Sequence, residues 1–265
     1  MYSRTKLVLK YLRYYFTAAN GKGHGIHSPF VFEFITRVLN DTIHYPEYAT
    51  IESLREDALK NHKEITINDL GAGSGQTKSN TRTISSIARN AAKPKKFGQL
   101  LYRMAKFYKP STIVELGTSL GFTTAYLATG NAAAKVITME GSENVLAEAQ
   151  FHFDRLTLEN IRTVIGNFDD VLDPTISALT SIDLAFIDGN HRYEPTLRYF
   201  NSLLSKTNNE SIIILDDIHW SAEMEKAWEH CKDHSSVTLS IDLFFIGILI
   251  FRKEIKEQQH FVIRF

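Results

Sequence analysis

Short apolar runs alternate with amphipathic stretches through the C-terminal two-thirds of the chain. The apolar runs, which we interpret as strands, are Thr112–Leu116, Lys135–Glu140, Arg162–Ile165, Ile182–Ile187 and Ser211–Leu215. Helical patterns fill the intervals, near residues 122–130, 143–156, 169–179, 194–206 and 221–233. Strands that are apolar nearly throughout and separated by helices indicate a parallel sheet covered on both faces. Right-handed crossovers between them predict a doubly wound α/β fold.

The pattern changes after the last of these helices. Val237–Ile241 and Phe244–Phe251 are two strand-like runs with almost nothing between them. That spacing suits a tight turn and predicts an antiparallel pair that closes the edge of the sheet.

The first 90 residues follow a different pattern. Met1–Phe16 predicts an amphipathic helix that packs on the domain or contacts a membrane surface. A break at Gly21–Gly25 follows, and Ser28 and Pro29 are expected to cap and open a second helix. The polar stretch 76–82 reads as a loop. We expect residues 1–91 to form a helical appendage with a short strand and a loop, and residues 92–265 to form the main domain.

Composition narrows the class of protein. Thirty Lys and Arg residues balance thirty Asp and Glu residues, so no electrostatic argument favours nucleic acid as a partner. Cys231 is the only cysteine, which excludes an intrachain disulfide and fits a reducing cytoplasm. No apolar run reaches the roughly 18 residues of a membrane span, so no stable membrane insertion is expected. The appended residues are able to bury an interface, which leaves a homodimer open.

Two glycine-rich segments compete for the role of cofactor loop, Asp69–Gly75 and Glu115–Gly121. Such a loop must join a buried strand to a helix that packs back on the sheet. Only polar residues follow Gly75, whereas Gly121 is followed by an apolar helical pattern and then by the strand Lys135–Glu140. We therefore assign the cofactor to the second segment and interpret the first as a lid or substrate-side loop.

The spacing around the second loop discriminates between adenosine cofactors. Glu140 ends a strand 19 residues beyond Gly121, where a carboxylate accepts hydrogen bonds from both ribose hydroxyls. A dinucleotide pattern that began at Gly117 would need glycines at positions 119 and 122, but Ser119 and Phe122 stand there. S-adenosylmethionine has no pyrophosphate and tolerates a looser glycine pattern, so the spacing favours it over NAD.

Residues 112–252 resemble class I S-adenosylmethionine-dependent methyltransferases, with the small-molecule O-methyltransferase-like branch closest. The stretches that carry the resemblance are Val114–Thr124, Ile137–Gly141, Ile182–Glu194 and Ile213–Trp220. The resemblance implies a Rossmann-like, mostly parallel sheet with a terminal antiparallel strand pair, and S-adenosyl-L-methionine as the cofactor.

The resemblance also implies roles for individual residues. The residues implied at the methionine end of the cofactor are Glu115, Gly117, Thr118, Ser119 and Gly121. Glu140 would hold the ribose, and Asn167 and Phe168 would lie beside the adenine. Asn167 replaces the usual acid, although its carbonyl still accepts a hydrogen bond from the adenine amino group. Asp188, at the end of the fourth strand, would face both the cofactor and the acceptor.

An oxygen acceptor must lose its proton, either to a base or to a metal ion that lowers its pKa. We expect His191, three residues beyond Asp188, to be the base, with His219 as the other candidate; a hydrogen bond from His191 to a loop carbonyl is the structural alternative. Asp188, Asp216 and Asp217 all lie at carboxyl ends of strands and suit Mg²⁺ or Ca²⁺. Alternatively, Asp217 caps the following helix and Asp216 binds loop amides.

The expected function is methyl transfer from S-adenosylmethionine to a small-molecule acceptor, with oxygen as the methylated atom. A nitrogen acceptor would require little change in sequence. Two other classes remain open: a non-catalytic domain that binds a cofactor or a partner, and an NAD-dependent oxidoreductase. The missing glycines and the terminal strand pair argue against the oxidoreductase.

Overall fold

The computed structural model describes residues 1–67, 80–90 and 93–265. The chain forms two compact units, one made of residues 41–172 and the other of residues 1–40 together with 173–265. The competing glycine segment Asp69–Gly75 lies outside the described residues. The division predicted after residue 91, between appendage and main domain, stays a prediction.

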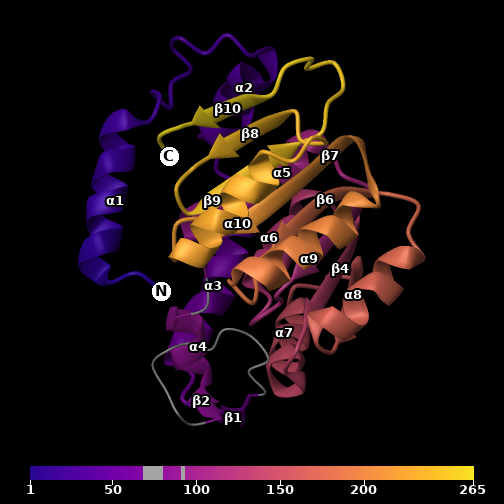
Figure 1. The fold of residues 1–265 in the computed structure, drawn as a ribbon. Helices are drawn as coiled ribbons and strands as arrows, with labels where there is room; N and C mark the ends of the chain where they lie inside the picture. The colour runs from indigo at the N-terminus through magenta and orange to yellow at the C-terminus, as the bar shows by residue number, and fades with distance from the viewer. Residues whose placement is uncertain (68–79, 91–92) are drawn as a thin grey trace. The chain divides into compact units, whose positions relative to one another are not determined.

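The unit of residues 41–172 contains a parallel three-stranded sheet in the order β3-β4-β5 (Figure 1). Its strands are β1 Glu64–Thr66, β2 Thr81–Thr83, β3 Thr112–Leu116, β4 Lys135–Glu140 and β5 Ile161–Ile165. Its helices are α3 Pro46–Lys60, α4 Ile84–Asn90, α5 Lys95–Tyr108, α6 Phe122–Gly130 and α7 Glu143–Arg155, and α8 Phe168–Ser177 begins in it. The predicted loop at 76–82 is wrong at its end, because residues 81 and 82 belong to β2, which pairs with β1 in an antiparallel ribbon.

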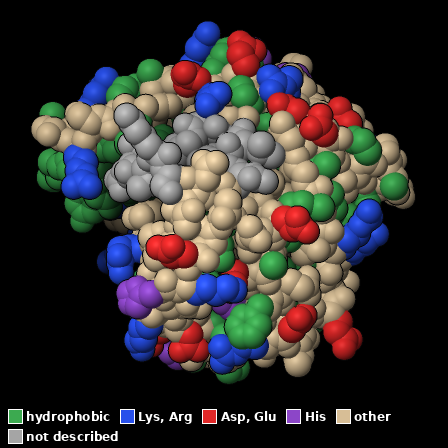
Figure 2. All heavy atoms as spheres, turned by 90° about the horizontal axis from the view of Figure 1, so that it is seen from below, with side chains coloured by type: hydrophobic (Ala, Val, Ile, Leu, Met, Phe, Trp, Pro, Cys, Tyr) green, Lys and Arg blue, Asp and Glu red, His purple; other side chains and the backbone are tan. Residues whose placement is uncertain are grey.

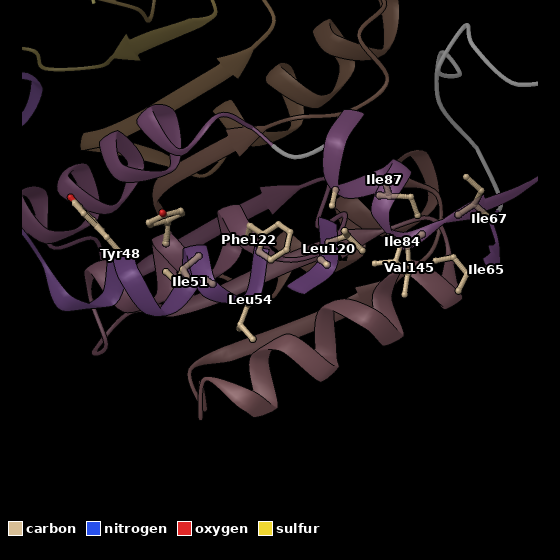
Figure 3. Close-up of a cluster of buried hydrophobic side chains, with 14 of the residues drawn as sticks. Tyr48, Ile51, Leu54, Ile65, Ile67, Ile84, Ile87, Leu120, Phe122 and Val145 are labelled. Atoms are coloured by element: carbon tan, nitrogen blue, oxygen red, sulfur yellow. The ribbon is translucent and has the colours of Figure 1, made fainter. Parts of the chain in front are cut away.

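The core of this unit joins its sheet to its first helices. Strands β3 and β4 are buried along nearly their whole length, as expected for strands covered on both faces. Figure 3 shows a second layer of the core, in which apolar side chains from α3, β1 and α4 meet those at the start of α6 and α7. Leu54, Ile65 and Ile84 lie there with Phe122 and Val145. This packing supports the loop between β3 and α6 from one side.

The second unit holds the remaining strands in the order β10-β8-β9-β7-β6 (Figure 1). They are β6 Ile182–Ile187, β7 Thr207–Asp216, β8 Leu239–Asp242, β9 Ile246–Ile250 and β10 Gln259–Val262. Between them lie α9 Tyr193–Leu204 and α10 Ala222–Lys232. Strands β6 and β7 are parallel, while β9 is antiparallel to both β7 and β8.

The predicted antiparallel pair is confirmed as β8 and β9, but its predicted place at the sheet edge is wrong. Strand β10 pairs in parallel with β8 and lies outside it. Residues Gln259–Val262 alternate half-buried and exposed positions over only four residues. So short and polar a segment gives little periodic signal in the sequence.

The N-terminal 40 residues contribute α1 Arg4–Thr17, the short helix α2 Pro29–Glu33 and the π-helix η1 Phe34–Leu39. Ser28 occupies the N-cap position of α2 with Pro29 as the first helical residue, as predicted, but the Ser28 side chain makes no capping hydrogen bond. No helix among residues 1–67, 80–90 and 93–265 is both long and apolar enough to cross a membrane.

Candidate functional site

A tight loop, residues 117–121, joins β3 to α6. Its backbone is left-handed at Gly117, Ser119 and Gly121, with φ values of 106°, 48° and 80°. The N–H groups of Gly117 and Thr118 donate to the carbonyl oxygen of Met139, at 3.0 and 3.1 Å. These two hydrogen bonds hold the loop against the end of the neighbouring strand β4. The backbone at the ends of β3 and β4 therefore lies at one edge of the sheet.

Gly121 is required at its position for two reasons. Its positive φ is a conformation that side chains other than glycine adopt only at a cost. A Cβ placed there would lie 2.5 Å from Cε1 of Phe153 on α7, well inside van der Waals contact. The loop backbone therefore passes close to α7, and the adjoining carbonyl of Leu120 bonds Nδ1 of His152 on the same helix at 2.8 Å.

Glu140 lies at the end of β4 and connects two loops. Its Oε2 accepts the N–H of Ser119 at 2.9 Å, and its Oε1 accepts the N–H of Ser142 at 3.0 Å. The carboxylate is half-buried, and its orientation is set by these two backbone donors. An ionised carboxylate offers about four acceptor positions. Glu140 thus has the position and the acceptor capacity that the predicted ribose contact requires.

Glu115 is fully buried one residue before the end of β3. The hydroxyl groups of Thr124 and Thr138 donate to its Oε2, whereas its Oε1 is buried with no hydrogen-bond partner. The pKa of Glu115 is raised to about 7, mainly by burial and also by the charge of Glu140, although the two threonine hydrogen bonds act in the opposite direction. A carboxyl group in this setting suits a cationic ligand, which would stabilise its charged form.

Sequence reasoning missed both threonines that surround Glu115. Thr138 is a polar residue in an otherwise apolar strand, and its hydroxyl also bonds that of Thr118 at 2.6 Å. That interruption of the apolar run was the available signal. Thr124 gave none, because a threonine in a helix is ordinary.

Asn167 and Phe168 stand where β5 passes into α8, after Gly166, whose φ is 144°. The side-chain Oδ1 of Asn167 accepts the N–H of Asp169 at 3.2 Å and so caps the first turn of α8. Phe168 is half-buried at the first position of that helix. The adenine contacts of both residues stay predictions. Asn167 would contact the adenine while its Oδ1 also accepts the N–H of Asp169.

In the other unit, Asp188, His191 and Asp216 come together. One ligand atom from each lies within 4.8 Å of the other two, and Nε2 of His191 is 3.5 Å from Oδ1 of Asp188. Asp216 ends β7 and is only 1% exposed, whereas Asp188 and His191 are half-buried. Two carboxylates and an imidazole are a donor set for a divalent cation or for proton transfer.

The loop after β6 adopts an uncommon backbone conformation. Asn190 and His191 have φ values of 64° and 28°. Nδ2 of Asn190 donates to the hydroxyl of Tyr199 at 3.1 Å, and its Oδ1 is buried without a partner. Positive φ at non-glycine residues is concentrated at functional sites. Asn190 was missed in the sequence, where an asparagine after a glycine signals only a turn.

Asp217 is not a member of this cluster, although it was predicted as the third metal ligand. Successive residues of a strand point to opposite faces, and Asp217 follows Asp216 directly. Its backbone is left-handed, with a φ of 52°, and its N–H donates to the carbonyl of Phe245 at 2.7 Å. The alternative that Asp217 caps the next helix is wrong, because Ser221 is the N-cap of α10.

His219, the other candidate base, is held between two carboxylates. Its Nδ1 lies 3.0 Å from Oε1 of Glu225 and its Nε2 lies 2.8 Å from Oδ2 of Asp242. Burial lowers the pKa of His219, but the hydrogen bonds and charges of Asp242 and Glu225 outweigh burial and raise it. Carboxylates engage both ring nitrogens, which leaves neither nitrogen available to take a proton from an acceptor.

Part of this chain matches a described protein family. The family described as "Methyltransferase domain" matches residues 114–218. Residues 114–218 are therefore similar to a methyltransferase domain. The match begins in β3 and ends just after β7, so it contains the loop 117–121, Glu140, Asn167, and the cluster of Asp188, His191 and Asp216. The resemblance read from the sequence is confirmed.

Curated relatives of the methyltransferase domain are distant. An uncharacterized protein of Sinorhizobium fredii is 25% identical over 165 residues, which are 56% of this chain and 18% of that protein. An uncharacterized protein of Acanthamoeba polyphaga mimivirus is 26% identical over 127 residues, which are 44% of this chain and 57% of that protein. The alignments thus span less than two-thirds of either relative.

Solved structures show the same fold. An O-methyltransferase from Bacillus cereus, solved in complex with S-adenosylhomocysteine (SAH), matches with a TM-score of 0.54 and 18% identity. The match covers 83% of this chain and 97% of that protein. The predicted Rossmann-like, mostly parallel α/β fold is confirmed by this similarity and by the observed strand pairings.

Proposed function

We propose that this protein transfers a methyl group from S-adenosylmethionine to a small-molecule acceptor, with an oxygen as the methylated atom. One observation carries the proposal. Within the part of the chain that matches the methyltransferase family, the carboxylate of Glu140 is held at the end of β4 by the N–H groups of Ser119 and Ser142. The SAH found in the Bacillus cereus enzyme supports the choice of cofactor.

The residues of the loop fit such a cofactor. Gly121 lets the backbone turn into α6, whose first N–H groups and helix dipole would meet a ligand bound at the loop. Glu140 supplies carboxylate oxygens for the ribose hydroxyls, and Oε1 of Glu115 is a buried acceptor suited to a cationic ligand. When bound, S-adenosylmethionine supplies a methyl group already activated on a sulfonium centre.

The acceptor chemistry is assigned to the loop after β6. In the transfer, a bond forms between the acceptor oxygen and the methyl carbon as the carbon–sulfur bond breaks, and the acceptor proton must go to a base. His191 is the proposed base, and Oδ1 of Asp188 lies 3.5 Å from its Nε2. Orientation of the acceptor relative to the methyl carbon supplies much of the rate.

Ligand binding tests the proposal. SAH should raise the melting temperature of the protein and NAD should not. Replacing Glu140 with alanine should weaken SAH binding in calorimetry by about 5- to 150-fold, since a lost charged hydrogen-bond partner costs about 1–3 kcal/mol. Glu143→Ala, which removes an exposed carboxylate from the first turn of α7, is the matched control and should leave the affinity unchanged.

Two results would contradict this assignment. Stabilisation by NAD alone would identify a nicotinamide-dependent enzyme instead of a methyltransferase. Equal SAH affinity of the wild-type protein and the Glu140→Ala variant would remove Glu140 from the cofactor site, whatever its effect on the loops that it joins.

As an alternative to the base, we propose that Asp188, His191 and Asp216 hold a divalent cation, in which case His191 is a ligand and not the base. Carboxylate oxygens suit Mg²⁺ and Ca²⁺, the ions expected from the sequence, and the imidazole of His191 extends the fit to Mn²⁺. A cation there would lower the pKa of an acceptor hydroxyl and so assist its deprotonation.

Manganese provides a direct probe of this cluster, because the electron paramagnetic resonance signal of free Mn²⁺ falls when the ion binds protein. We expect one Mn²⁺ per chain, bound at least about tenfold more weakly by the Asp216→Asn and His191→Ala variants. Asp173→Asn, an exposed carboxylate of α8, should bind as the wild type does. If Asp216→Asn binds Mn²⁺ as tightly as the wild type, the cluster is not a metal site.

A further inference from the structure

Helix α1 has an inner face that holds it on its own unit. Tyr14 is buried, its hydroxyl donates to the carbonyl of Ile263, and its side chain clusters with Ala18 and Phe244. Tyr11 packs against the same cluster, with its ring centroid 5.1 Å from that of Phe244. These contacts attach the inner face of α1 to its unit. The opposite face of the helix takes no part in this attachment.

The outer face of α1 carries a second set of apolar side chains that contact water. Phe16 is 76% exposed and Leu9 62%, although residues of this size are usually buried. The exposed apolar residues of α1 recur at intervals of three and four residues, which places them along one side of the helix. The residues that form this outer face are Val8, Leu9, Leu12, Tyr15 and Phe16. A contiguous exposed apolar face of this kind marks a surface that meets something other than water.

Basic side chains border the outer face. Arg4, Lys6 and Arg13 are all exposed, and none of the three forms an ion pair with a carboxylate among the described residues. Lys10, by contrast, points inward and pairs with Glu225 at 2.8 Å. The helix therefore presents positive charge on the side that its own unit leaves open.

This charge is local in a chain that is neutral overall. Residues 1–32 contain five Lys and Arg residues and no Asp or Glu, whereas the whole chain holds thirty of each sign. On the face drawn in Figure 2, basic and acidic side chains are interspersed over most of the surface, and hydrophobic and basic side chains lie together at the left edge. A partner that fits must be negatively charged and must also accept aliphatic side chains.

We propose that α1 binds the surface of a membrane rich in anionic phospholipids. Apolar side chains of the outer face enter the boundary between headgroups and acyl chains, and Arg4, Lys6 and Arg13 contact lipid phosphates. A second copy of this chain fits less well, because a symmetric contact would bring two positive faces together. Nucleic acid would leave Val8 and Leu12 unexplained. The helix lies on the membrane and does not span it, and the proposal is independent of the methyl transfer.

Vesicle sedimentation of the full chain tests this inference. We expect binding to phosphatidylcholine vesicles that contain roughly 30% phosphatidylserine, little binding to pure phosphatidylcholine, and loss of binding as sodium chloride rises from about 0.1 to about 0.5 M. The double variant Lys6→Gln/Arg13→Gln should weaken binding about 30-fold, since each basic residue contributes about 1 kcal/mol near such a surface. Leu12→Ser/Phe16→Ser should weaken it at least about tenfold.

Matched controls separate this helix from general surface effects. Lys253→Gln/Lys256→Gln removes two exposed lysines, and Phe151→Ser removes an exposed phenylalanine of α7; neither should change vesicle binding. Melting temperatures of all variants should stay close to that of the wild type, because the replaced side chains are exposed.

Four outcomes would overturn the proposal. Failure to sediment with either kind of vesicle, or equal binding to both, would show that anionic lipid is not the partner. A dimer in light scattering that Leu12→Ser/Phe16→Ser dissociates, without vesicle binding, would assign the outer face to a second copy. Binding of a fluorescent oligonucleotide that requires Lys6 and Arg13 but not Leu12 and Phe16, again without vesicle binding, would assign the face to nucleic acid.

Discussion

Replacing Gly121 with alanine is expected to destabilise the fold by about 2–5 kcal/mol. The left-handed backbone at this position, with a φ of 80°, costs an L-residue about 1–2 kcal/mol. The added methyl group would lie 2.5 Å from the ring of Phe153, and such overpacking costs about 1–3 kcal/mol more. Denaturant unfolding of the two proteins measures the sum.

Gly25→Ala is the matched control for this change. Gly25 has nearly the same backbone conformation, with a φ of 78°, but a Cβ there would meet nothing within 4 Å. Its replacement should therefore cost only about 1–2 kcal/mol. If Gly121→Ala is no more destabilising than Gly25→Ala, the loop does not press against α7 as described. Loss of SAH affinity in Gly121→Ala alone would tie the same packing to cofactor binding.

Replacing Glu115 with glutamine is expected to change how stability depends on pH. Burial raises the pKa of Glu115 in the folded state to about 7, from an ordinary value of 4.5. The stability that comes from burying the neutral carboxyl is fully present below about pH 4.5 and is lost as the pH rises through about 7. Over that window the wild type should lose about 3 kcal/mol relative to Glu115→Gln, because one pKa unit corresponds to about 1.4 kcal/mol.

The measurement is the difference in free energy of unfolding between wild type and variant, taken at several pH values. The comparison cancels the titration of groups that both proteins share. Glu143→Gln, which replaces an exposed carboxylate in the first turn of α7, is the matched control for removing a carboxylate that is not buried. A difference for Glu115→Gln that does not vary with pH would show that Glu115 is not the group that titrates in the core.

The order of strands and helices was predictable from the sequence. Most of the strands are apolar runs long enough to be told apart from the amphipathic pattern of the helices. Thr112–Leu116, Lys135–Glu140 and Ile182–Ile187 have the predicted bounds. The predicted start of the last parallel strand was four residues late, because Thr207–Glu210 is polar and half-exposed. Strand β10 was missed for the related reason that four alternating residues carry too little periodicity.

The choice between the two glycine-rich segments was also accessible from the sequence. An apolar helix and then an apolar strand follow Gly121, and both are required to carry a cofactor loop. The methyltransferase family matches residues 114–218, which contain Glu115–Gly121 and not Asp69–Gly75. The roles of the individual loop residues stay predictions.

What the sequence by itself determined is therefore the class of fold and the resemblance to methyltransferases, since periodicity and motif spacing are local properties. The tertiary structure alone decided which side chains meet. His191 rather than Asp217 joins Asp188 and Asp216, because loop backbone angles and strand alternation set side-chain direction. The pKa of Glu115 is raised because the side chain is buried. The outer face of α1 is exposed because nothing covers it. In both cases the exposure of a residue depends on residues far away along the chain.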